Sequence, residues 1–251
     1  LIFSGVIGDS GNGYGISVVQ SGTLILSGQN TFSGNINMQS GNIRLLFAPI
    51  GEIRFNNVAT GFLQFGPGIT TDVSSRIKNN TPVVRIDTNG QSVTFSSLDT
   101  TNSGGLLKKG AGTLTLSGSG NTIRGAIQST EGTLAFTGTF TTASRISASD
   151  SAGNTGAISI SGTVTQSGGS FTVRSFQIAS GSNTSVGTCN ILPGASVTLG
   201  GGAMLGDNGT GGVAGGTGTF NQSGGTFNAN GDFWTAGGTS NVNLKIGRAH
   251  V

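Results

Sequence analysis

The residues able to do chemistry in this chain are few and lie far apart. Only nine Asp and Glu side chains occur in 251 residues, and none directly follows another. Glu52 and Asp72 are separated by about 20 residues, and so are Glu131 and Asp150. Two carboxylates held a few Å apart support general acid and base catalysis or bind Ca²⁺. Such pairs form here only if the backbone repeats about every 20 residues, so that one acid stacks on the other.

Nucleophilic and metal-binding side chains are equally sparse. His250 is the single histidine and Cys189 the single cysteine. Cys189 therefore has no internal disulfide partner, and we expect a buried, inert thiol. The turns Gly8-Asp9-Ser10-Gly11 and Gly206-Asp207-Asn208-Gly209 faintly resemble Ca²⁺-binding turns, but without tandem Gly-Gly-x-Gly-x-Asp nonapeptides we favour plain turns. We predict no catalytic residue, no metal site and no cofactor.

Charged and aromatic residues do not cluster along the sequence. The chain has 12 Lys plus Arg and a formal charge of +3. Lys108-Lys109 is the single pair of adjacent cations, and we expect the cations to be solvated on outward strand faces. A nucleic-acid site needs clustered charge, so we predict none. Phe233-Trp234 sends one ring to each face of a strand; the outer ring is able to stack on a sugar, but we favour core filling.

The elements that position these residues are set by a repeated sequence. Gly22-Thr23-Leu24-Ile25-Leu26-Ser27-Gly28 returns as Gly112-Thr113-Leu114-Thr115-Leu116-Ser117-Gly118, within longer copies near 15–45 and 105–136. A second pair of copies, 162–172 and 218–228, reads as two short strands joined at Ser-Gly-Gly. Successive Gly-anchored strands follow one another at about 20 residues, which is the spacing of solenoid repeats.

Alternation inside each repeat predicts which side chains enter the core. A period of two sends one set inward and the other outward, so Thr113 and Thr115 should face outward. Asn30 and Asn121 follow the strands at corners, where Asn either stacks into a hydrogen-bonded ladder or serves as an ordinary turn residue. Both interpretations stay open. The residues expected to point inward are Leu24, Leu26, Ile36, Leu114, Leu116, Ile127, Leu134 and Phe136.

Composition agrees with an all-β chain. There are 47 Gly, only 4 Pro and 8% charged residues, against about 7% Gly and about 25% charged residues in average soluble domains. No window has helical periodicity with capping signals, and no apolar run approaches the roughly 18 residues of a membrane helix. We therefore predict one right-handed parallel β-helix over 1–245, with about 20–25 residues per rung and no membrane-spanning segment.

The repeats resemble a known family. Residues 110–122, Gly-Ala-Gly-Thr-Leu-Thr-Leu-Ser-Gly-Ser-Gly-Asn-Thr, with Leu-Leu-Lys-Lys before them and Glu-Gly-Thr-Leu at 131–134, resemble the autotransporter-associated β-strand repeat of passenger domains. The copy at 15–45 is similar, and 162–238 resembles the Gly-Gly-rich repeats of related secreted proteins. Phe32 and Ile123 stand where the family usually has an aromatic residue, commonly Tyr. The resemblance implies a β-helix displayed on, or released from, a Gram-negative cell surface through a C-terminal translocator β-barrel.

Two features indicate that the sequence is a fragment. It begins at Leu1 in mid-strand without an initiator Met, and residues 246–251, Ile-Gly-Arg-Ala-His-Val, look like a translated sequencing adapter. We therefore expect a non-native tail at 246–251, which includes His250. A catalytic triad would then have no histidine. Neither a signal peptide nor a translocator barrel is visible in the sequence.

These observations favour a non-catalytic structural or adhesive segment of an extracellular or outer-membrane-associated protein. The expected partners are glycans or proteins on a host or neighbouring cell. The alternative is a polysaccharide-active β-helix enzyme or a phage tail-spike-like domain, which requires Glu52, Asp72 and either Arg54 or Arg76 to converge in a groove. Residues 46–100 are the least regular and are expected to vary the surface, with most of the local charge on Arg54, Asp72, Arg76, Lys78, Arg85 and Asp87.

Overall fold

The described part of the chain is all-β. The computed structural model describes residues 1–47, 51–56, 60–78, 82–100, 104–142, 144–148, 155–160, 162–166, 176–178, 185–206, 216–235 and 238–244. Within these ranges the only helical element is one 3-10 turn, η1 (Ser74–Arg76). Neighbouring strands pair in parallel throughout these ranges. The prediction of an all-β chain is confirmed.

The strands belong to four sheets. The eleven-stranded sheet contains β1 (Ile2–Phe3), β3 (Thr23–Leu26), β5 (Asn42–Leu45), β7 (Leu63–Phe65), β8 (Val84–Asp87), β11 (Leu106–Lys109), β14 (Ile127–Ser129), β17 (Ile146–Ala148), β20 (Phe176–Ile178), β23 (Ala203–Leu205) and β26 (Phe233–Thr235). The seven-stranded sheet contains β9 (Val93–Phe95), β12 (Thr113–Leu116), β15 (Glu131–Phe136), β18 (Thr155–Ile160), β21 (Val186–Ile191), β24 (Thr217–Gln222) and β27 (Thr239–Leu244). The six-stranded sheet contains β10 (Asp99–Thr100), β13 (Ser119–Ile123), β16 (Thr139–Thr142), β19 (Thr163–Gln166), β22 (Ser196–Leu199) and β25 (Thr226–Ala229). The three-stranded sheet contains β2 (Ile16–Val18), β4 (Ile36–Met38) and β6 (Ile53–Phe55).

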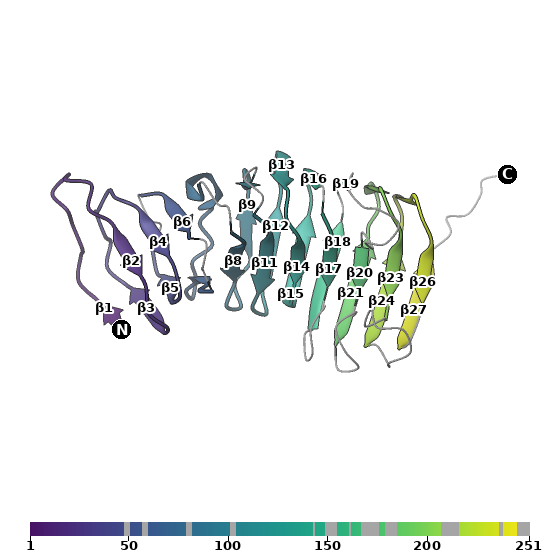
Figure 1. Ribbon diagram of the computed structural model, residues 1–251, viewed down its shortest axis with the longest axis horizontal. Helices are drawn as coiled ribbons and strands as arrows, with labels where there is room; N and C mark the ends of the chain where they lie inside the picture. The colour runs from purple at the N-terminus through teal and green to yellow at the C-terminus, as the bar shows by residue number, and fades with distance from the viewer. Residues whose placement is uncertain are drawn as a thin grey trace.

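From β8 onward the chain visits the eleven-, seven- and six-stranded sheets in turn. Strands β11, β12 and β13 are followed by β14, β15 and β16, each stacked on its counterpart, and we call three such successive strands a rung. The stacked strands make an elongated body with β1 at one end and β26 and β27 at the other (Figure 1). Eleven strands at about 4.8 Å spacing give the longest sheet a length of about 50 Å. This architecture is consistent with a β-helix or β-solenoid.

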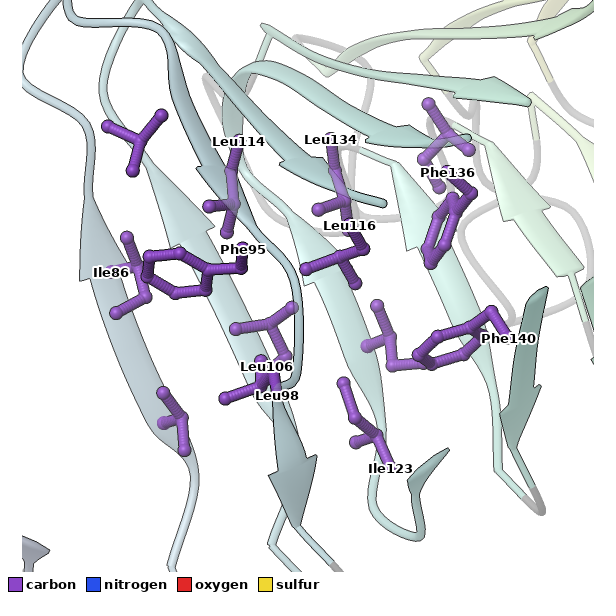
Figure 2. Close-up of a cluster of buried hydrophobic side chains, with 14 of the residues drawn as sticks. Ile86, Phe95, Leu98, Leu106, Leu114, Leu116, Ile123, Leu134, Phe136 and Phe140 are labelled. Atoms are coloured by element: carbon purple, nitrogen blue, oxygen red, sulfur yellow. The ribbon is translucent and has the colours of Figure 1, made fainter. Parts of the chain in front are cut away.

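The core runs between the sheets and follows the predicted alternation. In Figure 2, Leu114, Leu116, Leu134 and Phe136 point into one cluster together with Phe95 and Phe140. Thr113 and Thr115 lie on the opposite face of β12 and are half-buried. Leu24 is half-buried and packs against the core, which is less than predicted. The other residues expected inside are buried, as are Phe32 and Ile123: Leu26, Ile36, Leu114, Leu116, Ile127, Leu134 and Phe136.

Glycine lets successive rungs approach at one corner. An ideal Cβ at Gly138 would lie 2.3 Å from the carbonyl oxygen of Gly118, and one at Gly162 would lie 2.2 Å from that of Gly138. Either side chain would collide with the backbone of the preceding rung. The glycine column Gly118, Gly138 and Gly162 therefore permits the tight stacking that the parallel sheets require.

The near-identical copies do not occupy equivalent places. Gly22–Gly28 contains β3 of the eleven-stranded sheet, whereas Gly112–Gly118 contains β12 of the seven-stranded sheet. In the eleven-stranded sheet β3 is followed by β5, β7, β8 and β11, which is four steps, and β12 comes directly after β11 in the chain but belongs to the seven-stranded sheet. The later pair behaves in the same way, because β19 is in the six-stranded sheet and β24 in the seven-stranded sheet. The distance between copies is therefore not a whole number of rungs.

Rungs also lengthen along the chain. The hydrogen bond from Ser147 to Ile127 spans 20 residues, whereas that from Asn221 to Asn190 spans 31. Residues paired in register lie 17 to 24 apart as far as β19, close to the expected 20–25 residues per rung. The spacing is 27 to 33 residues in the pairs from β17–β20 to β23–β26, and it returns to 22 for β24 and β27. The additional residues lie in the links between β17 and β18, β19 and β20, β20 and β21, and β23 and β24. Links can lengthen because register depends on the stacked strands, and loop extension costs little free energy.

Candidate functional surface

The outer face of the eleven-stranded sheet gathers residues that are far apart in sequence. Strand pairing sets Arg44 opposite Gln64, Gln64 opposite Asp87, and Asp87 opposite Lys109. Alternation turns these four side chains outward, since their strand neighbours Leu45, Leu63, Ile86 and Lys108 are buried. The four residues form one row across β5, β7, β8 and β11.

Hydrogen bonds order this row. Arg44 Nε donates to Gln64 Oε1 at 3.3 Å, and Gln64 Nε2 donates to Asp87 Oδ2 at 3.0 Å. Asp87 Oδ1 accepts from the backbone N–H of Asn89 at 2.8 Å. Gln64 is only 9% exposed, so its amide is fixed between the arginine and the acid. Arg44 is thus oriented by a neutral partner, and within the described ranges it makes no ion pair.

A second row contains the aromatic ring that holds two cations. Arg85 lies opposite Leu107 in the register of β8 and β11. The guanidinium carbon of Arg85 lies 5.8 Å from the centroid of the Phe62 ring, and Lys109 Nζ lies 5.7 Å from it. Both contacts are within cation–π range. The aromatic ring attracts each cation without cancelling its charge. Desolvation lowers the pKa of Arg85, but a guanidinium stays charged at neutral pH. We call Arg44, Phe62, Arg85 and Lys109 the cationic patch.

Lys108 points the other way and is fully buried. Its Nζ donates to the carbonyl oxygens of Gly110 and Glu131, the latter at 2.7 Å. Desolvation lowers the pKa of Lys108 to about 8, although the charges of Asp87 and Glu131 act to raise it. The expectation that both residues of the Lys108-Lys109 pair are solvated is therefore wrong for Lys108. Alternation turns one lysine inward, where the backbone carbonyls of Gly110 and Glu131 accept its hydrogen bonds.

The predicted acid pairs have separate partners. Glu52 Oε2 accepts from Arg54 at 2.6 Å. Asp72 Oδ1 accepts from the backbone N–H of Ser74 at 2.8 Å. The bridge between Ile53 and Ile77 sets Arg76 beside Glu52 in register. Among the described residues no ion pair includes Asp72, so its carboxylate is not joined to the Glu52–Arg54 pair.

Glu131, of the second predicted acid pair, lies at the end of the cationic patch. Glu131 Oε1 is 3.9 Å from Lys109 Nζ, and Oε2 accepts from the backbone N–H of Gly110 at 3.2 Å. Its expected partner Asp150 lies outside the described residues. Within the described ranges no group of three or more His, Cys, Asp or Glu residues is arranged to hold a metal ion.

Asp9 and Asp72 share one bonding pattern that links rungs. In each, Oδ1 accepts from the backbone N–H two residues later. Oδ2 accepts from the backbone N–H and the hydroxyl of a serine 24 residues later, Ser33 for Asp9 and Ser96 for Asp72. The donors to Asp9 include a backbone N–H at 3.0 Å on each oxygen, an arrangement that suits a plain turn better than a Ca²⁺ site. Asp207, in the other predicted turn, lies outside the described residues.

These bonds stabilise the ionised carboxylates. Hydrogen bonds from Ser33, first from its backbone and then from its hydroxyl, lower the pKa of Asp9 to about 2. Desolvation acts to raise the pKa of Asp72, but the hydrogen bonds from Ser74 and Ser96 outweigh it, and the pKa is lowered. A carboxylic acid with a lowered pKa is a poor general acid at neutral pH. Both acids therefore act as clamps between rungs.

Asn30 and Asn121 behave as turn residues. Asn30 Nδ2 donates to the carbonyl of Gly28 at 2.8 Å, and Asn121 Nδ2 donates to the carbonyl of Gly118 at 3.0 Å. Asn30 Oδ1 also accepts from the backbone N–H of Ile7, 23 residues earlier, at 2.7 Å. The ladder interpretation fails at these corners because both amides bond to backbone groups and not to a stacked asparagine. An asparagine ladder does form on the outer face of the seven-stranded sheet, with bonds of 2.9 Å and 2.7 Å joining Asn190, Asn221 and Asn243. Asn190 lies opposite Asn221, and Asn221 opposite Asn243, in the register of the paired strands. This register is the signal that the sequence analysis missed.

The remaining candidate residues are Cys189, Phe233, Trp234 and His250. Cys189 is buried, and desolvation raises the pKa of its thiol, which disfavours the reactive thiolate. Phe233 and Trp234 are 40% and 48% exposed on β26 at the end of the sheet, so the expectation that one of these rings fills the core is wrong. His250 lies outside the described residues. The described part of the chain has no helix with the length and apolar character needed to cross a membrane.

Comparison with known proteins gives one informative relative. No protein-family profile matches the chain, and no solved structure matches it. The adhesin BmaC autotransporter of Brucella suis biovar 1 (strain 1330) is 29% identical over 229 residues, covering 80% of this chain. The same stretch spans only 6% of that relative. Most of this chain is thus similar to a short stretch of a much longer autotransporter adhesin.

Proposed function

We propose that this chain is a non-catalytic adhesive segment of a Gram-negative cell-surface protein, folded over 1–245 as a single right-handed parallel β-helix. The observation that carries the proposal is the similarity of 80% of the chain to an autotransporter adhesin. The parallel stacking of strands supports it, because a rod of rungs holds outward side chains away from a surface without needing a catalytic cleft.

The proposed partners are glycans or proteins on a host or neighbouring cell. Export through a translocator β-barrel belonging to the longer protein, and a non-native tail at 246–251, are parts of the same proposal. The dispersed acids support a non-catalytic role: Glu52 is held by Arg54, and Asp72 by Ser74 and Ser96. A polysaccharide-active enzyme would need such acids free to reach a substrate.

Adhesion is tested with beads coated with the full chain. We expect them to adhere to epithelial cells or to neighbouring bacteria above beads coated with an unrelated β-solenoid of similar size. Adhesion no greater than that control would overturn the proposal. The enzymatic alternative is measured in parallel as release of unsaturated sugars from pectin and alginate, with and without Ca²⁺. Turnover that is abolished in Asp72→Ala would replace the adhesive function with an enzymatic one.

A further inference from the structure

We propose that the cationic patch binds an acidic polysaccharide that lies along the long axis of the eleven-stranded sheet. The inference rests on the proposed adhesive function and names the ligand class. Cations on three strands line one outer face: Arg44 on β5, Arg85 on β8 and Lys109 on β11. An anionic ligand complements this face.

The partners of Arg44 and Lys109 leave much of the charge of these two side chains available to a ligand. Arg44 is oriented by the neutral amide of Gln64, and Lys109 by the ring of Phe62. The ion pair of Lys109 with Glu131 is 3.9 Å long between side chains that are 46% and 43% exposed, so it is weak in water. Gln64 and Asn89 both donate to Asp87, which reduces its competition for the cations.

Arg85 and Phe62 suit an acidic sugar. The guanidinium of Arg85 is half-buried over the ring of Phe62 on this outer face. The planar guanidinium matches the two oxygens of a carboxylate. Phe62, half-buried between the cations, and Leu107, half-buried opposite Arg85, offer apolar surface to the faces of sugar rings.

The length of the patch favours a polymer over a small anion. From β5 through β7 and β8 to β11 there are three steps between neighbouring strands, or about 15 Å at about 4.8 Å each. A single phosphate or sulfate ion would reach only part of this row. A linear polysaccharide with a carboxylate on each sugar can meet cations on successive strands.

The test measures binding of the full chain to immobilised polygalacturonate, with neutral dextran, dextran sulfate and duplex DNA in parallel. We expect binding to polygalacturonate that weakens with added salt, and none to dextran.

The double variant Arg85→Ala/Lys109→Ala should weaken binding about tenfold or more, and Phe62→Ala several-fold. Arg124→Ala is the matched control, because Arg124 is exposed outside the patch and should leave binding unchanged. Circular dichroism establishes that each variant is folded.

Three outcomes would overturn the inference. The first is no binding to polygalacturonate, and the second is binding by the folded patch variants that equals binding by the unsubstituted chain. The third is patch-dependent binding of dextran sulfate or DNA that is as tight as binding of polygalacturonate, because the patch would then not select carboxylated sugars. Bead adhesion measured on the same variants separates the two proposals. Adhesion without polysaccharide binding leaves the adhesive function standing and rules out the proposed ligand. Patch-dependent polysaccharide binding without adhesion keeps the ligand and rules out the adhesive function.

Discussion

At the scale of single residues, Lys108 shows how the stacked backbone receives a buried cation. Its ammonium group bonds to the carbonyls of Gly110 and Glu131, which belong to successive rungs. Gly132 makes room for it, because an ideal Cβ there would lie 2.6 Å from Lys108 Nζ. The absence of a side chain in one rung thus accommodates the amine of the rung before it.

The lowered pKa of Lys108 predicts an unusual dependence of stability on pH. The folded chain releases this proton near pH 8, whereas the unfolded chain keeps it until about pH 10.5. Between these values the unfolded state binds more protons, so the free energy of unfolding should rise with pH. Cys189 acts oppositely above about pH 9, because its raised pKa makes the folded state hold the extra proton.

Urea denaturation at several pH values between about 8 and 9 tests this prediction, since in that window the contribution of Lys108 outweighs the opposing contribution of Cys189. Lys108→Met should remove the rise, and Lys109→Met, at the neighbouring exposed position, should keep it. An unchanged slope in Lys108→Met would show that another group titrates.

At the scale of the strand, β12 shows what local sequence determines. Its alternation places Leu114 and Leu116 in the core and Thr115 on the outer side, as predicted, because a period of two is fixed within four residues. Which strands stack together is decided by chain segments about 20 to 31 residues apart. The cationic patch and the ladder through Asn221 depend on that stacking. Alternation alone therefore did not predict them.

Leu116→Ala should destabilise the protein by about 2–5 kcal/mol, because it opens a cavity in a core where Leu116 is 1% exposed. Thr115→Ala, in the same strand but half-buried on the other face, should change stability by no more than about 0.5 kcal/mol. Urea denaturation of both variants gives the comparison. Equal costs would refute the assigned faces of β12.

At the scale of the whole molecule, stability should be distributed along the rungs. Contacts in a solenoid join mainly neighbouring units, so a complete unit can be removed while the next one takes its place. Val84, Leu106 and Ile127 occupy the same register in β8, β11 and β14. Residues 106–126 therefore form one complete rung with its links.

Deletion of residues 106–126 should leave a folded β protein of lower stability. Deletion of 106–116 removes β11 and β12 but leaves β13, so the chain re-enters the stack in the wrong sheet and should lose cooperative unfolding. Far-UV circular dichroism and limited proteolysis distinguish the two products. If both deletions were equally folded, or equally unfolded, rungs would not be the units of stability.

The displacement of β12 from the sheet of β3 has an evolutionary consequence. A duplicated segment normally repeats the same surface in the same direction. Here the two copies of Gly-Thr-Leu-x-Leu-Ser-Gly belong to different sheets, so their outward side chains face different sides of the rod. When a copied gene segment is placed at a distance from the original that is not a whole number of rungs, its outward side chains thus face a different side of the rod and can meet a new neighbour. Directional variety then arises from the register of duplication, before any point mutation changes a contact.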